Sequence, residues 1–473
     1  MEKQEYDYGM IGLGTMGRNL VYNMCDHGYS VAGYDKDFSM VEKLEQGKGP
    51  YKIVGTRSLQ ELTDTLKKPR VLLMLVPAGP IVDAVIESLK PLLSKDDLLI
   101  DCGNSHFTDT NLRIDKLSKE NIHFMGIGIS GGEYGARNGP SIMPGGSKGA
   151  YAKVAPMLEA ISAKAKGEPC VTYLGAGSAG HYVKMVHNGI EYALMEIIAE
   201  AYQLLKQGAG LTNNQLHTVF TKWNDGSLQS FLISITADIF NQKDDLTGND
   251  LVDMILDSAH QKGTGAWTSE DAMALQVPVP VIDIAVSMRN LSALIKERQA
   301  ADQLLSGPKV KINYSNDELI DALEHALNFA IITVFAQGME LLSHASRVYK
   351  YDLKLENIAA IWREGCIIRS SVLEDIRTAF TMHPDLSNLM LSSVFKDRLV
   401  DLQEYARQIA RIGIDTGIPL PALMASVAYY DSYRSDWLPD NLLQAQRDYF
   451  GAHTYERTDR EGSFHTQWKQ LKR

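Results

Sequence analysis

The chain has 473 residues, of which 45% are hydrophobic and 22% charged, and its formal net charge is −11. This length predicts two or three globular domains, and the composition excludes a disordered protein. The negative charge disfavours a nucleic-acid partner, because its phosphates would be repelled, and it requires that any small anionic substrate meet a local cluster of Lys and Arg.

The N-terminal segment is acidic and poor in apolar residues, unlike a signal peptide, and no uninterrupted apolar run approaches the length of a membrane span. No group of His, Cys and Asp has metal-ligand spacing, which favours chemistry without a metal. The cysteines are far apart, so neither a disulfide framework nor a zinc site is indicated. A cytoplasmic protein without membrane attachment fits these features. The four cysteines are Cys25, Cys102, Cys170 and Cys366.

Up to about residue 178 short β-branched runs alternate with helical patterns. This alternation predicts a parallel, doubly wound sheet, so we expect an α/β Rossmann domain over residues 1–178. Strands are expected at residues 8–13, 30–34, 70–76, 98–102, 123–126 and 171–174.

A glycine-rich loop, Gly12-Leu-Gly14-Thr-Met-Gly17, follows the first expected strand and opens a helix. The first glycine permits a tight turn, the second lets the backbone approach a pyrophosphate, and the third lets helix and strand pack closely. The loop therefore predicts a dinucleotide site that includes Thr15 and Met16. A second match at residues 175–180 precedes one long helix and no further strand, so we interpret it as the turn into the next domain.

Asp35 ends the second expected strand and bears on the choice of cofactor. A carboxylate there accepts hydrogen bonds from the ribose of NAD and repels the 2′-phosphate of NADP. Lys36 partly offsets this repulsion and Asp37 adds to it. The pattern predicts NAD or NADP as cofactor, with NAD favoured.

After Gly180 helical patterns run almost unbroken to about residue 435, and a polar and aromatic segment follows. We expect a large all-α domain over residues 179–437 and a C-terminal tail over residues 438–473. Residues 200–205 and 223–226 resemble residues 338–342 and 362–365 at nearly the same spacing. The all-α domain is therefore interpreted as containing an internal helical duplication, although chance similarity of Leu-rich helices is an alternative.

A stripe of polar side chains marks the helix expected at residues 182–199, which is apolar on nearly every other side. Lys184, His187, Asn188 and Glu191 share one face, and burying such groups without partners is costly. One interpretation is an internal ion-pair network or a solvated stripe. The other is a catalytic face, on which a desolvated Lys acts as a base and a carboxyl group as an acid.

Two polar loops follow strands at the carboxyl edge of the expected sheet, where α/β proteins bind ligands. Residues 101–105 include Asn104, and residues 128–133 include Ser130. Both side chains can hydrogen-bond a hydroxyl or a carboxylate. The cations that an anionic substrate needs are assigned to Lys262, Arg289 and Arg447.

The sequence resembles the 6-phosphogluconate dehydrogenase family over essentially its whole length. The matching motifs lie at residues 12–20, 103–105, 128–137, 184–192, 261–265 and 444–453. The resemblance implies a Rossmann domain, a helical domain with a duplication and a C-terminal tail. It also implies oxidative decarboxylation of 6-phosphogluconate to ribulose 5-phosphate and CO2 with reduction of NAD(P)+, a step of the pentose phosphate pathway.

The resemblance also implies roles for individual residues. Lys184 would be the general base toward the C3 hydroxyl, and Glu191 would be the acid that protonates the enediol. The cofactor would be held by Gly12, Gly14, Thr15, Met16, Gly17, Asp35, Lys36, Val76 and Asn104. The substrate would be held by Asn104, Ser130, Gly131, Gly132, His187, Asn188, Tyr192, Lys262, Thr264 and Arg289.

In this family the tail threads through the neighbouring subunit, so the resemblance implies a homodimer in which Arg447 and His453 complete the partner's active site. Three positions depart from the family pattern. Residues 35–37 replace the Asn-Arg-Thr of NADP-using members, and Pro77 replaces a frequent Lys; both changes favour NAD. Ala266 replaces a frequent Lys beside the substrate motif.

Two other functions are compatible with parts of the sequence. A 3-hydroxyacid dehydrogenase acting on a small 3-hydroxyacid would share the glycine loop and the Lys, but it would lack the second helical half and the tail. A non-catalytic sensor of nicotinamide or sugar phosphate would not require both Lys184 and Glu191. Cys366 is interpreted as a buried residue that acts as a small hydrophobic side chain.

Overall fold

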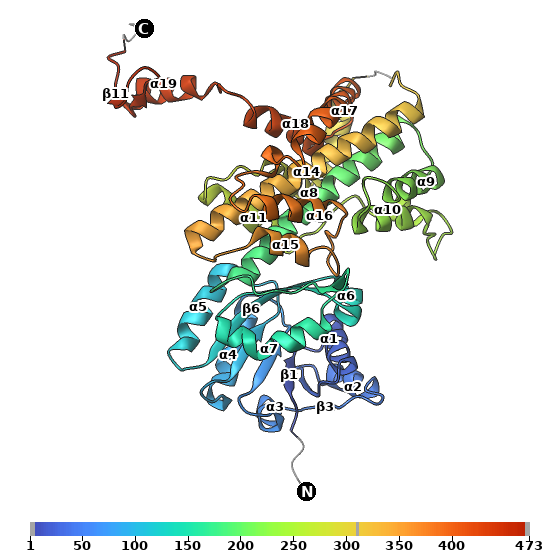
Figure 1. Ribbon diagram of the computed structural model, residues 1–473. Helices are drawn as coiled ribbons and strands as arrows, with labels where there is room; N and C mark the ends of the chain where they lie inside the picture. The colour runs from blue at the N-terminus through green and yellow to red at the C-terminus, as the bar shows by residue number, and fades with distance from the viewer. Residues whose placement is uncertain (1–4, 309–311, 469–473) are drawn as a thin grey trace. The chain divides into compact units, whose positions relative to one another are not determined.

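A computed structural model of the chain describes residues 5–308 and 312–468 (Figure 1). The chain forms two compact units, Met1–Ser426 and Val427–Arg473. The first unit contains a seven-stranded sheet and the large set of helices that follows it. Part of the acidic N-terminal segment, residues 1–4, lies outside the described residues.

The sheet has the strand order β3-β2-β1-β4-β5-β6-β7. All neighbours are parallel except β6 and β7, which are antiparallel. The expectation of a wholly parallel sheet is therefore wrong at this edge. The strands are β1 (Tyr8–Ile11), β2 (Val31–Tyr34), β3 (Ile53–Gly55), β4 (Val71–Met74), β5 (Leu98–Asp101), β6 (His123–Ser130) and β7 (Ser141–Pro144).

Five of the six expected strands are present, and the sixth, at residues 171–174, is wrong. Val171 forms a single bridge to Ile142, and Leu174 only donates its N–H to the carbonyl of Pro144, so no ladder develops. Two strands of this sheet, β3 and β7, were not expected. The second of these pairs with the end of β6, which continues through Ser130 instead of ending at Gly126.

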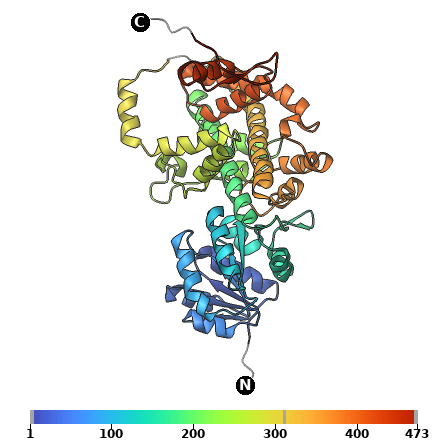
Figure 2. The same cartoon turned by 90° about the vertical axis from the view of Figure 1, so that its left-hand side faces the viewer.

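Helices cover both faces of the sheet, as alternating strand residues require (Figure 2). Leu73 and Ile100 point into a core with α1 and α7, whereas Leu72 and Leu99 point into a core with α3, α4 and α5. The doubly wound arrangement is thereby confirmed. These helices are α1 (Thr15–Asp26), α2 (Phe38–Gln46), α3 (Leu59–Thr65), α4 (Pro80–Leu89), α5 (Phe107–Ser118), α6 (Gly132–Asn138) and α7 (Lys148–Ile161).

A small hairpin of β8 (Lys164–Ala165) and β9 (Glu168–Pro169) precedes the helical part, which begins with the long helix α8 (Ala179–Gln203). The glycines at residues 175–180 lead directly into this helix. The others are α9 (Asn213–Asn224), α10 (Phe231–Asn241), α11 (Thr264–Ala274), α12 (Pro280–Ser292), α13 (Ile295–Leu304), α14 (Asn316–Tyr349), α15 (Leu355–Ile361), α16 (Val372–Met382), α17 (Lys396–Thr416) and α18 (Pro421–Tyr433).

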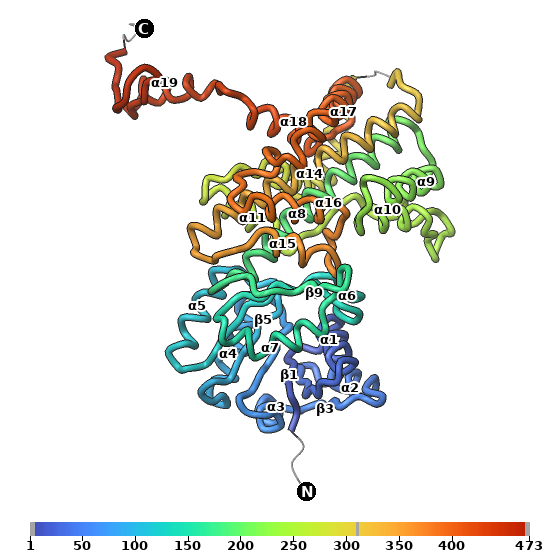
Figure 3. Tube along the Cα trace, viewed as in Figure 1, coloured from blue at the N-terminus to red at the C-terminus, as the bar shows by residue number. Residues whose placement is uncertain are grey.

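The helical part repeats one arrangement, in agreement with the predicted duplication. The long helices α8 and α14 pack against each other (Figure 3). Each is followed by a shorter helix that leads to a fully buried Trp, Trp223 or Trp362, and by a second short helix. The two halves meet in an antiparallel bridge between Ser230 and Ser370.

Helix α14 is long and apolar enough to cross a membrane, but most of its apolar stretch is buried inside the protein. It is therefore a core helix. Among the described residues no other helix meets the length and composition of a membrane span.

The second unit contains the end of α18, the helix α19 (Asp440–Gly451) and a short hairpin of β10 (Tyr455–Glu456) and β11 (Ser463–Phe464). The fully buried carboxylate of Asp448 lies at the centre of a hydrogen-bond network in this unit. It accepts hydrogen bonds from the backbone of Thr454 and Thr466, from the indole of Trp468 and from His465. Their hydrogen bonds hold its pKa far below the ordinary value.

Candidate active site

The glycine loop has the geometry that its spacing predicts. Gly12 adopts a φ of +92°, and a Cβ there would lie 2.4 Å from the carbonyl oxygen of Leu75. A Cβ on Gly17 would lie 2.0 Å from the carbonyl oxygen of Gly12, whereas a Cβ on Gly14 would meet nothing within 4 Å. The first and third glycines are thus required by packing, and the second leaves open space at the start of α1, where a pyrophosphate can approach.

Asp35 lies directly after β2 and is bound to the glycine loop. Its carboxylate accepts the backbone N–H of Leu13 at 2.6 Å and that of Asp37 at 2.9 Å. Lys36 is exposed beside it, and Val76, in the loop that follows β4, packs against Gly12. A negative charge is therefore fixed beside the N-terminus of α1.

The polar stripe of α8 faces the carboxyl end of β6. A Cβ on Gly128 would lie 2.4 Å from the Cβ of Lys184, so only glycine lets the strand and the helix approach this closely. Lys184, His187 and Asn188 are buried, and the Glu191 side chain is 20% exposed. The stripe therefore lies inside the protein with its Glu191 end open.

Hydrogen bonds join the stripe into a chain centred on His187. The Nδ1 atom of His187 lies 3.0 Å from Asn188 Oδ1 and 3.4 Å from Lys184 Nζ, and its Nε2 atom lies 3.3 Å from Ser130 Oγ. The amide of Asn188 donates to the hydroxyl of Thr264 at 3.1 Å. A carboxylate oxygen of Glu191 is 3.8 Å from His187 Nδ1.

Burial shifts the protonation of all three titratable groups on this face. It lowers the pKa of Lys184, and the nearby Glu191 and Cys366 only partly oppose this. It also lowers the pKa of His187 well below its ordinary value, with a further contribution from the Lys184 charge. It raises the pKa of Glu191, against the attraction of Lys184 and Arg289. The face therefore favours a neutral amine, a neutral imidazole and a protonated carboxyl group.

A cation lies at the Glu191 end of the stripe. The guanidinium of Arg289, on α12, stacks 3.5 Å from the ring centroid of Tyr192. Thr264 begins α11, and Lys262 is exposed two residues before it. The predicted residues Tyr192, Thr264 and Arg289 therefore lie next to the stripe, and Lys262 lies on a loop that leads into it.

The two polar loops meet the same edge of the sheet. Asn104 is exposed after β5, whereas Ser130 is the buried last residue of β6. Gly131 has a φ of +116°, and Gly132 begins α6. The prediction that residues 128–133 form a loop is thus wrong for the first three of them, because they belong to β6.

Groups of the second helical half complete the site, and of these only Cys366 was named from the sequence, without a role in the site. The backbone N–H of Ile367 lies 3.4 Å from Ser130 Oγ, and Trp362 packs edge-on against His187 with ring centroids 5.6 Å apart. Cys366 is buried near Lys184, and burial raises the pKa of its thiol to about 12. The match between residues 362–365 and 223–226 was the only sequence signal for this segment.

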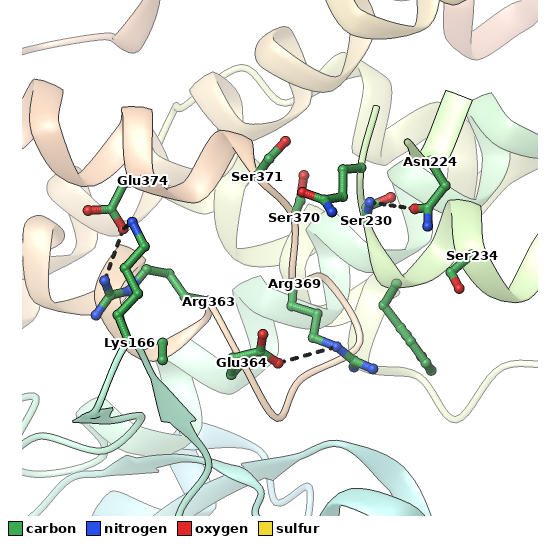
Figure 4. A pocket seen from close by; sticks show the side chains of 13 residues that line it. Lys166, Asn224, Ser230, Ser234, Arg363, Glu364, Arg369, Ser370, Ser371 and Glu374 are labelled. Atoms are coloured by element: carbon green, nitrogen blue, oxygen red, sulfur yellow. Dashed lines mark hydrogen bonds and ion pairs between the residues drawn. The ribbon is translucent and has the colours of Figure 1, made fainter. Parts of the chain in front are cut away.

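A pocket of about 510 Å³ is lined by this segment together with residues of α9, α10 and α16 (Figure 4). Its cations already have partners, since Arg363 pairs with Glu374 and Glu168, and Arg369 lies 3.7 Å from Glu364. None of the predicted site residues lines it. We therefore place the candidate active site at the α8 stripe and not in this pocket.

Arg447 and His453 belong to the second unit and are exposed there. Arg447 donates to the side chain of Gln444 in α19. Their predicted role in a neighbouring subunit's site stays a prediction. Among residues 5–308 and 312–468, no three His, Cys, Asp or Glu side chains are grouped so that they could hold a metal ion.

Comparison with known proteins identifies the family. Residues 7–175 match the model of the NAD binding domain of 6-phosphogluconate dehydrogenase, and residues 180–468 match that of its C-terminal domain. The chain is 52% identical to the NADP(+)-dependent, decarboxylating 6-phosphogluconate dehydrogenase of Bacillus subtilis, over 99% of this chain and 100% of that protein. It is 49% identical to the decarboxylating enzyme of Escherichia coli, with the same coverage.

A solved structure agrees with the sequence comparison. The 6-phosphogluconate dehydrogenase of Plasmodium falciparum, described with NADP+ and with 6-phosphogluconate, matches 98% of this chain and 100% of its own, with a TM-score of 0.94 and 42% identity. The chain therefore belongs to the 6-phosphogluconate dehydrogenase family.

Proposed function

We propose that the protein oxidises and decarboxylates 6-phosphogluconate to ribulose 5-phosphate and CO2, with reduction of a nicotinamide cofactor. One observation carries the proposal: the α8 stripe combines a buried amine, a neutral imidazole and a carboxyl group of raised pKa on one face. An oxidation followed by a decarboxylation needs both a base and an acid, and this face supplies them. Membership of the family supports the choice of substrate.

Lys184 acts first, as the general base. Its neutral amine takes the proton of the C3 hydroxyl while C3 loses a hydride. The resulting 3-keto acid loses CO2 as the C1–C2 bond breaks, and the electron pair of that bond forms an enediol. The Lys184 ammonium returns its proton to the developing enol oxygen, so the amine is regenerated.

Glu191 completes the reaction as the general acid. Burial raises the pKa of its carboxyl group and so favours the protonated form, which can donate a proton to the enediol carbon that becomes C1 of ribulose 5-phosphate. The open position of Glu191 at the end of the stripe suits a group that must recover a proton from solvent.

The remaining polar groups hold the sugar acid. Ser130, Gly131, Gly132, His187 and Asn188 surround the carboxylate and hydroxyl end, with Asn104 at the sheet edge. At the other end Arg289, fixed by its stacking on Tyr192, binds the phosphate together with Thr264 and Lys262. Lys262 and Arg289 supply the local positive charge that an anionic substrate needs in a protein with a net charge of −11.

The glycine loop fits a dinucleotide because there is open space next to Gly14, whereas Gly12 and Gly17 are tightly packed against backbone atoms. Thr15, Met16 and Val76 complete this cradle, and Asp35 and Lys36 lie where the adenosine ribose would be recognised. When bound, the nicotinamide supplies the hydride acceptor.

The preference for NAD remains our hypothesis, and its support is the carboxylate of Asp35 held at 2.6 Å from the Leu13 N–H. The Bacillus subtilis relative is named as NADP(+)-dependent, so the comparisons support NADP use in the family and not the NAD preference. Side-by-side measurement of kcat/KM with both cofactors decides the matter. Asp35→Asn, which removes the charge and keeps an acceptor for Leu13, should shift the ratio toward NADP; an unchanged ratio would refute the role of Asp35.

We further propose a cytoplasmic homodimer in which Arg447 and His453 of one copy enter the site of the other. Both side chains are exposed in a tail unit that has its own hydrogen-bonded centre at Asp448. Mixing inactive Lys184→Met with inactive Arg447→Ala chains should restore part of the activity, because one site of the mixed dimer is intact. A mixture as inactive as its components would refute shared sites.

The catalytic roles are tested with Lys184→Met and Glu191→Gln. Removing a general base or acid should lower kcat by about 10²- to 10⁴-fold. Glu196→Gln is the matched control, because Glu196 is on the same helix and near Arg289 but off the stripe, and burial raises its pKa to about 7. Equal losses in all three variants would mean that the stripe acts only through stability.

A further inference from the structure

Two loops at the carboxyl edge of the sheet lie side by side in the proposed site. Residues 75–79 follow β4 and include Val76, and residues 102–106 follow β5 and include Asn104. The backbone N–H of Cys102 donates to the carbonyl of Met74 at 2.9 Å. A Cβ on Gly103 would lie 3.2 Å from the carbonyl oxygen of Val76, so the loops touch through their backbones. Their relative position decides where cofactor and substrate meet.

One buried cation bridges these loops. The side chain of Arg113, on α5, is 4% exposed. Its guanidinium binds both carboxylate oxygens of Asp83 on α4, at 2.7 and 3.0 Å, and the carbonyl oxygen of Gly79 at 3.1 Å. On its other side it donates to the hydroxyl of Ser105 at 3.2 Å. The same planar group thus holds the end of the first loop and the end of the second.

A fully buried carboxylate continues the network toward Asn104. Asp101 accepts the backbone N–H of Gly103 at 2.9 Å and the hydroxyl of Ser105 at 2.6 Å. Its nearer oxygen lies 3.5 Å from Arg113, which supplies the opposite charge that a buried carboxylate needs. Asn104 lies between the two residues that Asp101 holds, so its backbone is fixed from both sides.

We infer that Arg113 is a positioning residue, which fixes the cofactor loop at Val76 against the substrate loop at Asn104. It touches neither reacting group and acts through Gly79, Asp83, Ser105 and Asp101. A misplacement of about 1 Å between reacting groups can cost about a hundredfold in rate, so a guanidinium that binds both loops affects hydride transfer through the positions of those loops. This inference rests on the proposed function.

The geometry of the guanidinium is the essential feature, because it offers donors in a fixed planar fork. Lysine keeps the charge but cannot bind Asp83 in bidentate fashion and also reach Ser105. Arg113→Lys should therefore stay folded and behave more like Arg113→Met in catalysis than like the unmodified protein.

The experiment compares the unmodified protein with Arg113→Lys and Arg113→Met, using 6-phosphogluconate carrying hydrogen or deuterium at C3. We expect kcat/KM to fall by about 10- to 100-fold in both variants. We also expect the deuterium isotope effect on kcat/KM to rise, because hydride transfer becomes the slow step. A loss of folded protein alone would lower the activity without changing the isotope effect.

Lys116→Met is the matched control. Lys116 also joins α5 to α4, through an exposed ion pair with Glu87, but it touches neither loop. It should leave the kinetics and the isotope effect unchanged. Asp83→Asn weakens only the contact of Arg113 with α4, so its isotope effect should lie between those of the unmodified protein and Arg113→Met. This variant provides the test if Arg113→Met does not fold.

Two outcomes separate the inference from the function it rests on. An unmodified protein that does not turn over 6-phosphogluconate would refute the proposed function. An active unmodified protein whose Arg113 variants keep the normal isotope effect, or change no more than Lys116→Met, would overturn the positioning role of Arg113.

Discussion

Two glycines of the same loop should respond differently to substitution by alanine: Gly17 should lose stability, and Gly14 should lose dinucleotide affinity. A Cβ on Gly17 would lie 2.0 Å from the carbonyl oxygen of Gly12, and backbone cannot move aside as a flexible side chain can. Overpacking of this kind costs about 1–3 kcal/mol or more in stability. We therefore expect Gly17→Ala to lower the melting temperature clearly.

Gly14→Ala should leave stability nearly unchanged. Gly14 has a φ of −57°, which alanine adopts without strain, and its added Cβ would meet nothing within 4 Å. The entropy gain of about 0.4–1 kcal/mol on replacing glycine roughly offsets the poorer N-cap. The methyl group would instead occupy the approach path of a pyrophosphate.

The assay for both variants combines thermal unfolding with dinucleotide binding followed by protein fluorescence. For Gly14→Ala we expect normal unfolding and a Kd raised at least about tenfold, which corresponds to about 1.4 kcal/mol. Gly17→Ala should show lowered stability whatever its affinity. Normal dinucleotide affinity in Gly14→Ala, or equal destabilisation of the two variants, would refute the assignment of the open space to the cofactor.

Further predictions concern titration and thiol reactivity. The pH profile of kcat/KM should rise as Lys184 loses its proton and fall as Glu191 loses its own, and Glu191→Gln should abolish only the alkaline fall. Burial raises the pKa of Glu200 to about 8, although its carboxylate accepts the N–H groups of Ala422 and Leu423. Because the folded-state pKa exceeds the unfolded value, this group's contribution is present at acidic pH and is lost as pH rises through about 8. As pH rises toward about 8, the melting temperature should fall less in Glu200→Gln than in the unmodified protein. An equal fall in the two proteins would contradict this. Cys366 should resist thiol reagents until the protein unfolds, since burial raises its pKa to about 12; rapid labelling of the folded protein at Cys366 would refute its burial.

The local features of the site were predictable because they depend on short spacings. The glycine loop is defined within six residues, and the stripe of Lys184, His187, Asn188 and Glu191 follows from helical periodicity alone. Burial of that stripe, which decides its pKa values, was expected from the apolar sides of the same helix and is confirmed.

Features that depend on distant pairing were not predictable in this way. Val171 and Leu174 have strand propensity, but each makes only a single contact with the segment that forms β7. Because no continuous ladder of hydrogen bonds forms there, the segment is not a strand despite its propensity. Ile367 approaches Ser130 across more than half the chain, and no local pattern indicates it. Arg113 is likewise one of many helical cations, and only the fold shows that its guanidinium is buried between two loops.

The central claim is that Lys184 on the α8 stripe drives oxidation coupled to decarboxylation. The most direct measurement follows reduced nicotinamide and CO2 together, with 6-phosphogluconate as substrate, for the unmodified protein and Lys184→Met. We expect the unmodified protein to form both products in equal amounts and Lys184→Met to form almost neither. Turnover of a small 3-hydroxyacid without turnover of 6-phosphogluconate, binding without any turnover, or full activity in Lys184→Met would contradict the claim.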